Sequence, residues 1–145
     1  MREILFRAKQ KDNGEWIEGY YACESNHACF KGELKHHHYI WKDVFMDWNL
    51  GGLEQYEIFP ETVRQYTGLT DKDGNKIFEG DICQTKGFPL IDELPFVVEW
   101  NPEECSFYWR DIKGTDEFNI GVSQNTIVIG NIHDNPELLK GGKDK

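Results

Sequence analysis

The sequence predicts a mainly β protein in which an N-terminal β-hairpin region packs on a C-terminal SH3-like small antiparallel barrel. Aromatic residues make up 14% of the chain and favour strands. Asn13-Gly14 stands between two apolar segments, and Asn-Gly supplies the positive φ angles that a tight hairpin turn requires. After residue 70, short apolar segments alternate with turns that contain Gly, Pro or Asn, a pattern typical of small barrels.

Residues 1–60 are expected to form the N-terminal β region. Segments 4–8 and 15–21 flank the Asn-Gly turn and predict its two strands. Residues 34–44 predict a further strand, after a loop at 23–32. Residues 46–60 are expected to be irregular and to end in a short strand, which Pro60 closes because it has no N–H for the ladder.

Residues 61–140 are expected to form the barrel, and residues 141–145 a frayed polar tail. A turn at 71–75 leads into it, and Asn135 and Pro136 predict a final helical turn, with Asn135 as the cap. The expected barrel strands are 82–85, 96–100, 106–112, 117–122 and 126–132.

The composition limits the function classes. The chain has 145 residues and a net charge of −10, from 16 basic and 26 acidic residues, which disfavours binding to nucleic acid. Its apolar runs fall short of the ~20 residues that a membrane span needs, so no membrane association is expected. The four cysteines are far apart and the residues after Met1 are not expected to form a secretory leader, so reduced thiols in a cytoplasm are predicted.

A Cys/His cluster is the weak metal candidate. Zinc needs convergent soft ligands, but the spacing here matches no familiar finger or ribbon. A polar loop and strand explain the same residues, so the favoured prediction is that the protein holds no metal and no cofactor. The weak candidates are Cys23, His27, Cys29, His36 and His38.

Asp71, Asp73 and Asn75 are spaced like the first ligands of a calcium loop. The twelfth position, where a bidentate acid is required, is occupied by Ile82, so a simple turn is the preferred interpretation. The sequence also contains no nucleophile elbow, phosphate loop or dinucleotide fingerprint. No catalytic residue is therefore assigned, and the protein is predicted not to be an enzyme.

The five tryptophans are more than a core of this size readily hides. We expect Trp16, Trp100 and Tyr66 in the core. Protein contacts are rich in large aromatic side chains. The predicted contact residues are Trp41, Trp48 and Trp109.

Three stretches of the chain together resemble the YopX family of phage and prophage proteins. The main one is residues 60–82, PETVRQYTGLTDKDGNKIFEGDI; the others are residues 6–16 at the start and 129–139 at the end. The resemblance implies a small phage-borne protein in a bacterial host cell. The motif residues, read as structural, are Tyr66, Thr67, Gly68, Leu69, Gly74, Gly80, Asp81, Gly130 and Asn131. Gly80 is expected at a backbone position that needs a positive φ.

The expected function is a non-enzymatic binding or assembly module of the host cytoplasm. Small β units leave sheet edges and apolar surface uncovered, so a homo-oligomer is expected, with a phage or host protein as a further candidate partner. Two alternatives stay open. One is a nucleic-acid-binding accessory protein; the other is a metal-dependent enzyme that uses the Cys/His cluster.

Overall fold

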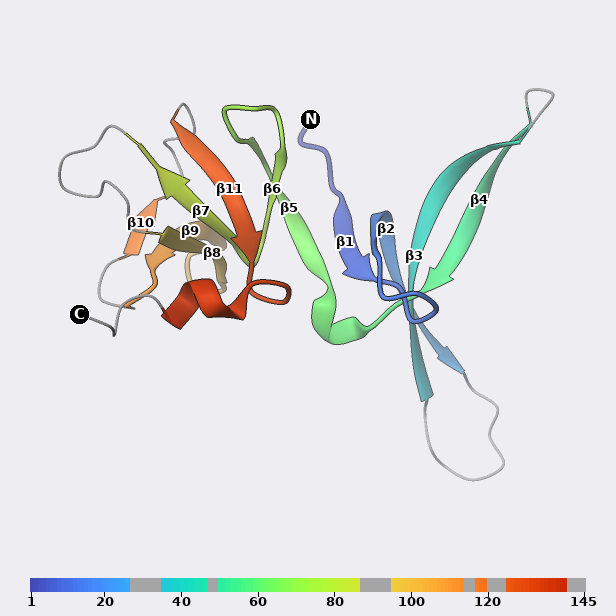
Figure 1. The fold of residues 1–145 in the computed structure, drawn as a ribbon. Helices are drawn as coiled ribbons and strands as arrows, with labels where there is room; N and C mark the ends of the chain where they lie inside the picture. The colour runs from blue at the N-terminus through green and yellow to red at the C-terminus, as the bar shows by residue number, and fades with distance from the viewer. Residues whose placement is uncertain (27–34, 47–49, 87–94, 114–116, 120–124, 141–145) are drawn as a thin grey trace. The chain divides into compact units, whose positions relative to one another are not determined.

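The computed structural model describes residues 1–26, 35–46, 50–86, 95–113, 117–119 and 125–140. These residues form a mainly β structure with two antiparallel sheets and two short 3-10 helices (Figure 1). None of the described helices is long and apolar enough to cross a membrane. The elements are β1 (Phe6–Lys9), β2 (Trp16–Asn26), β3 (Lys35–Met46), β4 (Leu50–Glu57), η1 (Pro60–Thr62), β5 (Arg64–Thr70), β6 (Lys76–Phe78), β7 (Asp81–Thr85), β8 (Pro95–Asn101), β9 (Ser106–Asp111), β10 (Glu117–Asn119), β11 (Thr126–Asn131) and η2 (Pro136–Lys140).

The chain divides into two compact units. Unit 1 contains residues 3–65 with Met1, and unit 2 contains residues 66–145 with Arg2. The division falls inside β5, whose first residues pair with β1 while Tyr66 pairs with Phe78 of β6. The sequence had placed this boundary five residues earlier, after Pro60.

The predicted hairpin of unit 1 is confirmed. β1 and β2 pair antiparallel across the Asn13-Gly14 turn, with Ala8 opposite Ile17. Alternate residues of a strand point to the same face, so these two apolar side chains lie together on one side of the sheet. With Ile40 and Ile58 they form the buried core of the unit, where Ala8, Ile40 and Ile58 have no exposed surface.

Gly19 allows β2 and β3 to approach closely. A Cβ atom built on Gly19 would lie 2.2 Å from the carbonyl oxygen of Trp41 and 2.8 Å from Cγ2 of Ile40. Neither distance is compatible with van der Waals contact, and the nearer atom belongs to the backbone, which cannot rotate away. No local pattern in the sequence around Gly19 predicts this requirement.

Unit 2 has its own core. In β9 every second residue is buried, and Phe107 and Trp109 pack there with Phe96 and Val98 of β8 and with Cys83 of β7. Burial raises the pKa of the Cys83 thiol far above its ordinary value, with a further contribution from Asp81. The predicted strands 82–85, 96–100 and 106–112 match β7, β8 and β9 closely.

The predicted closed barrel is wrong. A barrel requires its two outermost strands to pair with each other. In the described part of unit 2 the strand order is β10-β9-β8-β7-β11, so β10 and β11 remain edges and the sheet is open. The segment that was expected to contribute to the barrel before β7 forms β5 and β6, which belong to the order β4-β3-β2-β1-β5-β6.

Asp71 fastens the turn between β5 and β6 to β11. Its buried carboxylate accepts hydrogen bonds from the backbone N–H groups of Asp73 (2.9 Å), Asn75 (2.8 Å) and Val128 (3.2 Å). Burial alone would raise the pKa of this carboxyl, but the hydrogen bonds from Asn75, Val128 and Asp73 outweigh burial and lower it.

Gly80 and Asp81 form the turn into β7. Gly80 has φ of 79°, which confirms the predicted need for a positive φ. Its N–H donates to the carbonyl of Val98 at 2.7 Å, and its own carbonyl accepts from Ile132 at 3.0 Å. The buried carboxylate of Asp81 accepts the N–H of Phe78 at 2.8 Å, so this turn ties β7 to its neighbours on both sides.

Gly19→Ala should destabilise the protein by about 1–3 kcal/mol, because the added methyl group overpacks the contact between β2 and β3. Gly52→Ala is the matched control, since the nearest atom to a Cβ there is Cγ2 of Val44 at 4.0 Å. Chemical denaturation of both variants measures the difference. Equal unfolding free energies for the two variants would contradict the proposed role of Gly19.

Asp71→Asn should lower the melting temperature at neutral pH. The difference in melting temperature between this variant and the wild type should become smaller in acid. The folded-state pKa of Asp71 lies below its ordinary value of 3.8, so the carboxylate stabilises the fold above that pH. This contribution is lost as the pH falls through the folded-state pKa. Melting curves from neutral to strongly acidic pH test this, with exposed Asp73→Asn as the control. A difference that stays constant with pH would contradict it.

Candidate functional site

The two faces of the sheet formed by β2, β3 and β4 carry the residues of functional interest. Cys23 lies opposite His38, and Tyr20 lies opposite Trp41. Opposite residues in an antiparallel pair share a face, and neighbours along a strand alternate between faces. One side is therefore an imidazole face with Tyr21, Cys23, Ser25, His36 and His38, and the other is an aromatic face with Tyr20, Trp41 and Leu53.

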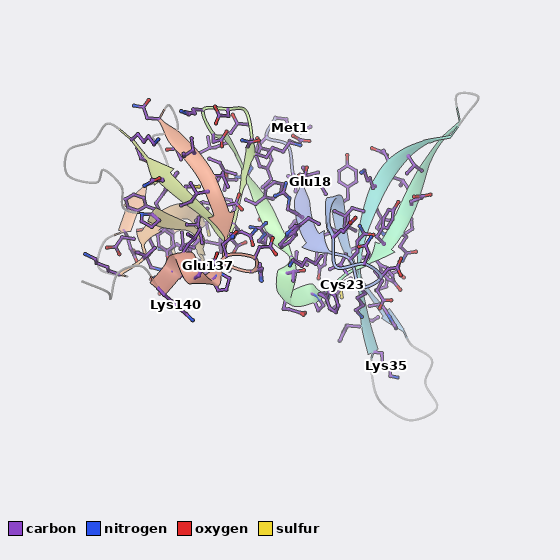
Figure 2. All side chains as sticks on the ribbon, in the orientation of Figure 1. Met1, Glu18, Cys23, Lys35, Glu137 and Lys140 are labelled. Carbon is purple, nitrogen blue, oxygen red and sulfur yellow. The ribbon has the colours of Figure 1, made fainter. Side chains whose placement is uncertain are left out.

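Polar contacts cross the imidazole face from β2 to β3. The hydroxyl of Tyr21 lies 2.7 Å from Nδ1 of His38, and the two rings stack at 6.0 Å. The hydroxyl of Ser25 lies 3.1 Å from Nδ1 of His36, and the thiol of Cys23 lies 4.0 Å from the same nitrogen. Figure 2 labels Cys23 on β2 and Lys35 at the start of β3. Burial and, secondly, the charge of Cys23 raise the pKa of Tyr21.

The structure brings three of the five weak metal candidates together. Cys23, His36 and His38 share the imidazole face, as the alternation of a strand requires. His27 and Cys29 lie outside the described residues. Within the described ranges, no three His, Cys, Asp or Glu side chains are arranged to hold a metal ion. Instead, the imidazole of His38 lies beside the hydroxyl of Tyr21, and that of His36 lies beside the hydroxyl of Ser25.

The aromatic face is exposed. Tyr20 is 53% exposed and Leu53 is 56% exposed, while Trp41 is half-buried between their strands. Trp41 lies opposite Tyr20 on β2 and opposite Gln55 on β4. Leu53 is two residues before Gln55 in β4, so its side chain lies on the same face. The three apolar side chains thus form a strip that crosses all three strands.

Of the three predicted contact tryptophans, Trp41 lies on this face, Trp109 lies elsewhere and Trp48 is not described. Trp48 lies outside the described residues. Trp109 is only 6% exposed and packs edge-on against Phe96, so its assignment to a contact is wrong. Trp100, expected in the core, is 38% exposed because it lies near the end of β8, where it packs against Phe107 from one side.

β4 begins at Leu50, in a part of the chain where irregular structure was predicted before a short final strand. Gly51-Gly52 and the lack of alternation give no local strand signal. Pairing with β3 overrides this weak local preference, because each residue of β4 has a partner, from Glu57 opposite Tyr39 to Leu50 opposite Met46. β2 pairs with β3 only as far as Trp41. Beyond this point β3 and β4 continue as a two-stranded ribbon (Figure 1), with a hollow of about 540 Å³ beside Asp43, Val44 and residues 51–53.

The Tyr66–Leu69 part of the YopX-like stretch has structural contacts. Tyr66 packs against Phe78 with ring centroids 5.6 Å apart. The hydroxyl of Thr67 donates to the carbonyl of Ile77 at 2.8 Å and accepts the N–H of Leu69 at 3.2 Å. Gly68, with φ of 90°, lies between them at a backbone conformation that a side chain would strain.

The turn and C-terminal residues of the pattern also have structural partners. Gly74 closes the Asp71 turn, donating to the carbonyl of Asp71 at 3.1 Å. At Gly130 a Cβ would lie 2.5 Å from Oδ1 of Asn135. Oδ1 of Asn131 accepts the N–H groups of His133 and Asp134, both at 3.0 Å, and so shapes the turn into η2.

A charged cluster lies on the partly exposed side of β8 and β9. Nε of Arg110 donates to Glu99 at 2.9 Å, and the hydroxyl of Tyr108 donates to the same carboxylate at 2.7 Å. The hydrogen bond to Glu99, with burial second, raises the pKa of Tyr108 to about 12. The hydrogen bond from Arg110 lowers the pKa of Glu99. Each charge is thus neutralised within the cluster, which is suited to holding two strands in register.

Comparisons with known proteins concern the fold and the family of the chain. No curated protein matches the chain. The crystal structure of protein EF1440 from Enterococcus faecalis is similar in fold, with a TM-score of 0.57 and 22% identity over 96% of this chain and 99% of that one. The model of the family described as YopX protein matches residues 5–140. The chain therefore belongs to the YopX family.

Proposed function

We propose that this YopX family protein is a non-enzymatic binding or assembly module, encoded by a phage or prophage and acting in the cytoplasm of the bacterial host. The observation that carries the proposal is the aromatic face of Tyr20, Trp41 and Leu53, because it places apolar side chains in contact with water on a sheet. Side chains of this kind provide most of the binding energy in many protein contacts.

The arrangement of these side chains favours a protein partner. Tyrosine and tryptophan supply a large contact area and lose little conformational entropy when they are covered. Here they project from adjacent strands, so the backbone already holds them in place. Leu53 extends the strip onto β4, next to the hollow at residues 51–53.

Two buried carboxylates of the structure support a non-enzymatic role. Asp71 and Asp81 are buried, and both accept backbone N–H groups of their own turns. These hydrogen bonds lower the pKa of Asp71, and a carboxylate held by its own turn is poorly placed to exchange protons with a substrate. Their contacts are those of structural residues.

A second copy of the chain is the partner that we favour, with a phage or host protein as the other candidate. Two-stranded ribbons are only marginally stable in water, and the extension of β3 and β4 beyond β2 is such a ribbon. Association through an identical ribbon would cover this surface twice in one symmetric contact.

The wild-type protein should show a mass above the 17.0 kDa monomer in light scattering at micromolar concentration. Leu53→Asp should shift the mass toward the monomer, because a charge at this exposed position of β4 would then be desolvated in the contact. Glu24→Ser is the matched control, since Glu24 is an exposed residue of β2 on the same face, beyond the strip. A wild-type mass of 17.0 kDa at every concentration would remove the self-association from the proposal.

A further inference from the structure

The outer edge of β4 has a defined set of outward-pointing backbone groups. The N–H of Ile58 donates to the carbonyl of His38 at 3.0 Å, in line with the β3–β4 register. In an antiparallel pair, residues alternate between those bonded to the neighbouring strand and those facing away. Counting back from Ile58, the residues of β4 that face away from β3 are Gly51, Leu53, Gln55 and Glu57.

The hairpin between β1 and β2 covers only one end of this edge. The carbonyl of Glu57 accepts the N–H of Lys11 at 2.9 Å, which confirms that Glu57 faces outward. No backbone hydrogen bond within the described part of the chain links the outward groups of Gly51, Leu53 or Gln55 to another segment. β4 therefore offers a short open edge that can accept one more strand.

We propose that this edge pairs antiparallel with β4 of a second copy, about a two-fold axis at Leu53. In this register Leu53 lies opposite the second copy's Leu53, and Gly51 lies opposite the second copy's Gln55. Each such pair exchanges two backbone hydrogen bonds. The inference rests on the self-association proposed above and assigns its register.

The side chains of β4 favour a second copy as the occupant. The two leucines, each 56% exposed in the single chain, would cover one another on the aromatic face. Glu54 would lie opposite the second copy's Gly52, so no carboxylate faces another directly, although each chain has a net charge of −10. An unrelated strand would need both an apolar residue opposite Leu53 and an uncharged residue opposite Glu54.

The composition and shape of the edge also permit the pairing. Strand edges that must stay single are commonly protected by lysine or proline, and residues 50–57 contain neither. A Cβ on Gly51 would meet no atom within 4 Å, so the sheet face at this residue is open. The hollow of about 540 Å³ lies at the same residues.

A charge exchange at position 53 tests this register. Leu53→Lys and Leu53→Glu should each weaken the dimer at least tenfold, because the axis brings like charges together. An equimolar mixture of the two variants should associate again, since Lys then faces Glu. Light scattering and sedimentation of the full chain, alone and mixed, give the masses. Asn125→Lys, exposed in unit 2, controls for the added charge.

The outcomes separate this inference from the proposed function. A dimeric wild type, monomeric single variants and a dimeric mixture would support the register. If the wild type and both variants are oligomeric, or if the mixture stays monomeric, the pairing at Leu53 is overturned while self-association stands. If the wild type itself is monomeric, the self-association and this register both fall, and the open edge is left to a foreign strand. Melting curves confirm that each variant is folded, as the exposure of Leu53 leads us to expect.

Discussion

The double pairing of β3 is the constraint on which unit 1 depends. Residues 39–41 are the part of β3 that is held by β2 on one side and by β4 on the other. The side-chain period of a strand is two, so this register decides which residues are buried. It directs Ile40 into the core, where it has no exposed surface, and turns Trp41 to the opposite face. A slip of one residue would exchange the two.

The same register explains why the imidazole face and the aromatic face have different characters. Ile40 belongs to the core and Tyr56 packs against it on the imidazole face. His38 lies on the same face, where the hydroxyl of Tyr21 contacts its ring. On the other face no described hydrophobic cluster includes Trp41. Burial on one side only is the common arrangement for an antiparallel sheet, and it leaves the aromatic face on the uncovered side.

Local chemistry made part of this structure predictable. The Asn13-Gly14 turn, the positive φ at Gly80 and the helical turn at Pro136 follow from the conformational limits of individual residues, and all are found. The strands of unit 2 were visible as separate apolar segments. Which strands pair, however, depends on contacts between distant residues, so the open sheet could not be distinguished from a closed barrel.

The candidate surface was harder to predict for the same reason. Trp41 was identified by type, but Tyr20 and Leu53 join it only because three strands share one register. Trp109 was misassigned because its direction depends on the alternation of β9, which starts from the turn after Asn101. Gly19 and β4 were missed because neither carries a local signal. Both depend on what a neighbouring strand does.

Because Cys83 is buried in the core of unit 2, its reaction with a thiol reagent can measure local unfolding of that core. Cys23 and Cys105 are free and exposed, whereas Cys83 is free but has no exposed surface and its pKa is raised by burial. A thiol in this state neither meets an alkylating reagent nor ionises to react with it. The rate at which Cys83 is modified therefore follows the fraction of time that the core of unit 2 is exposed, while the two surface thiols record the concentration of reagent.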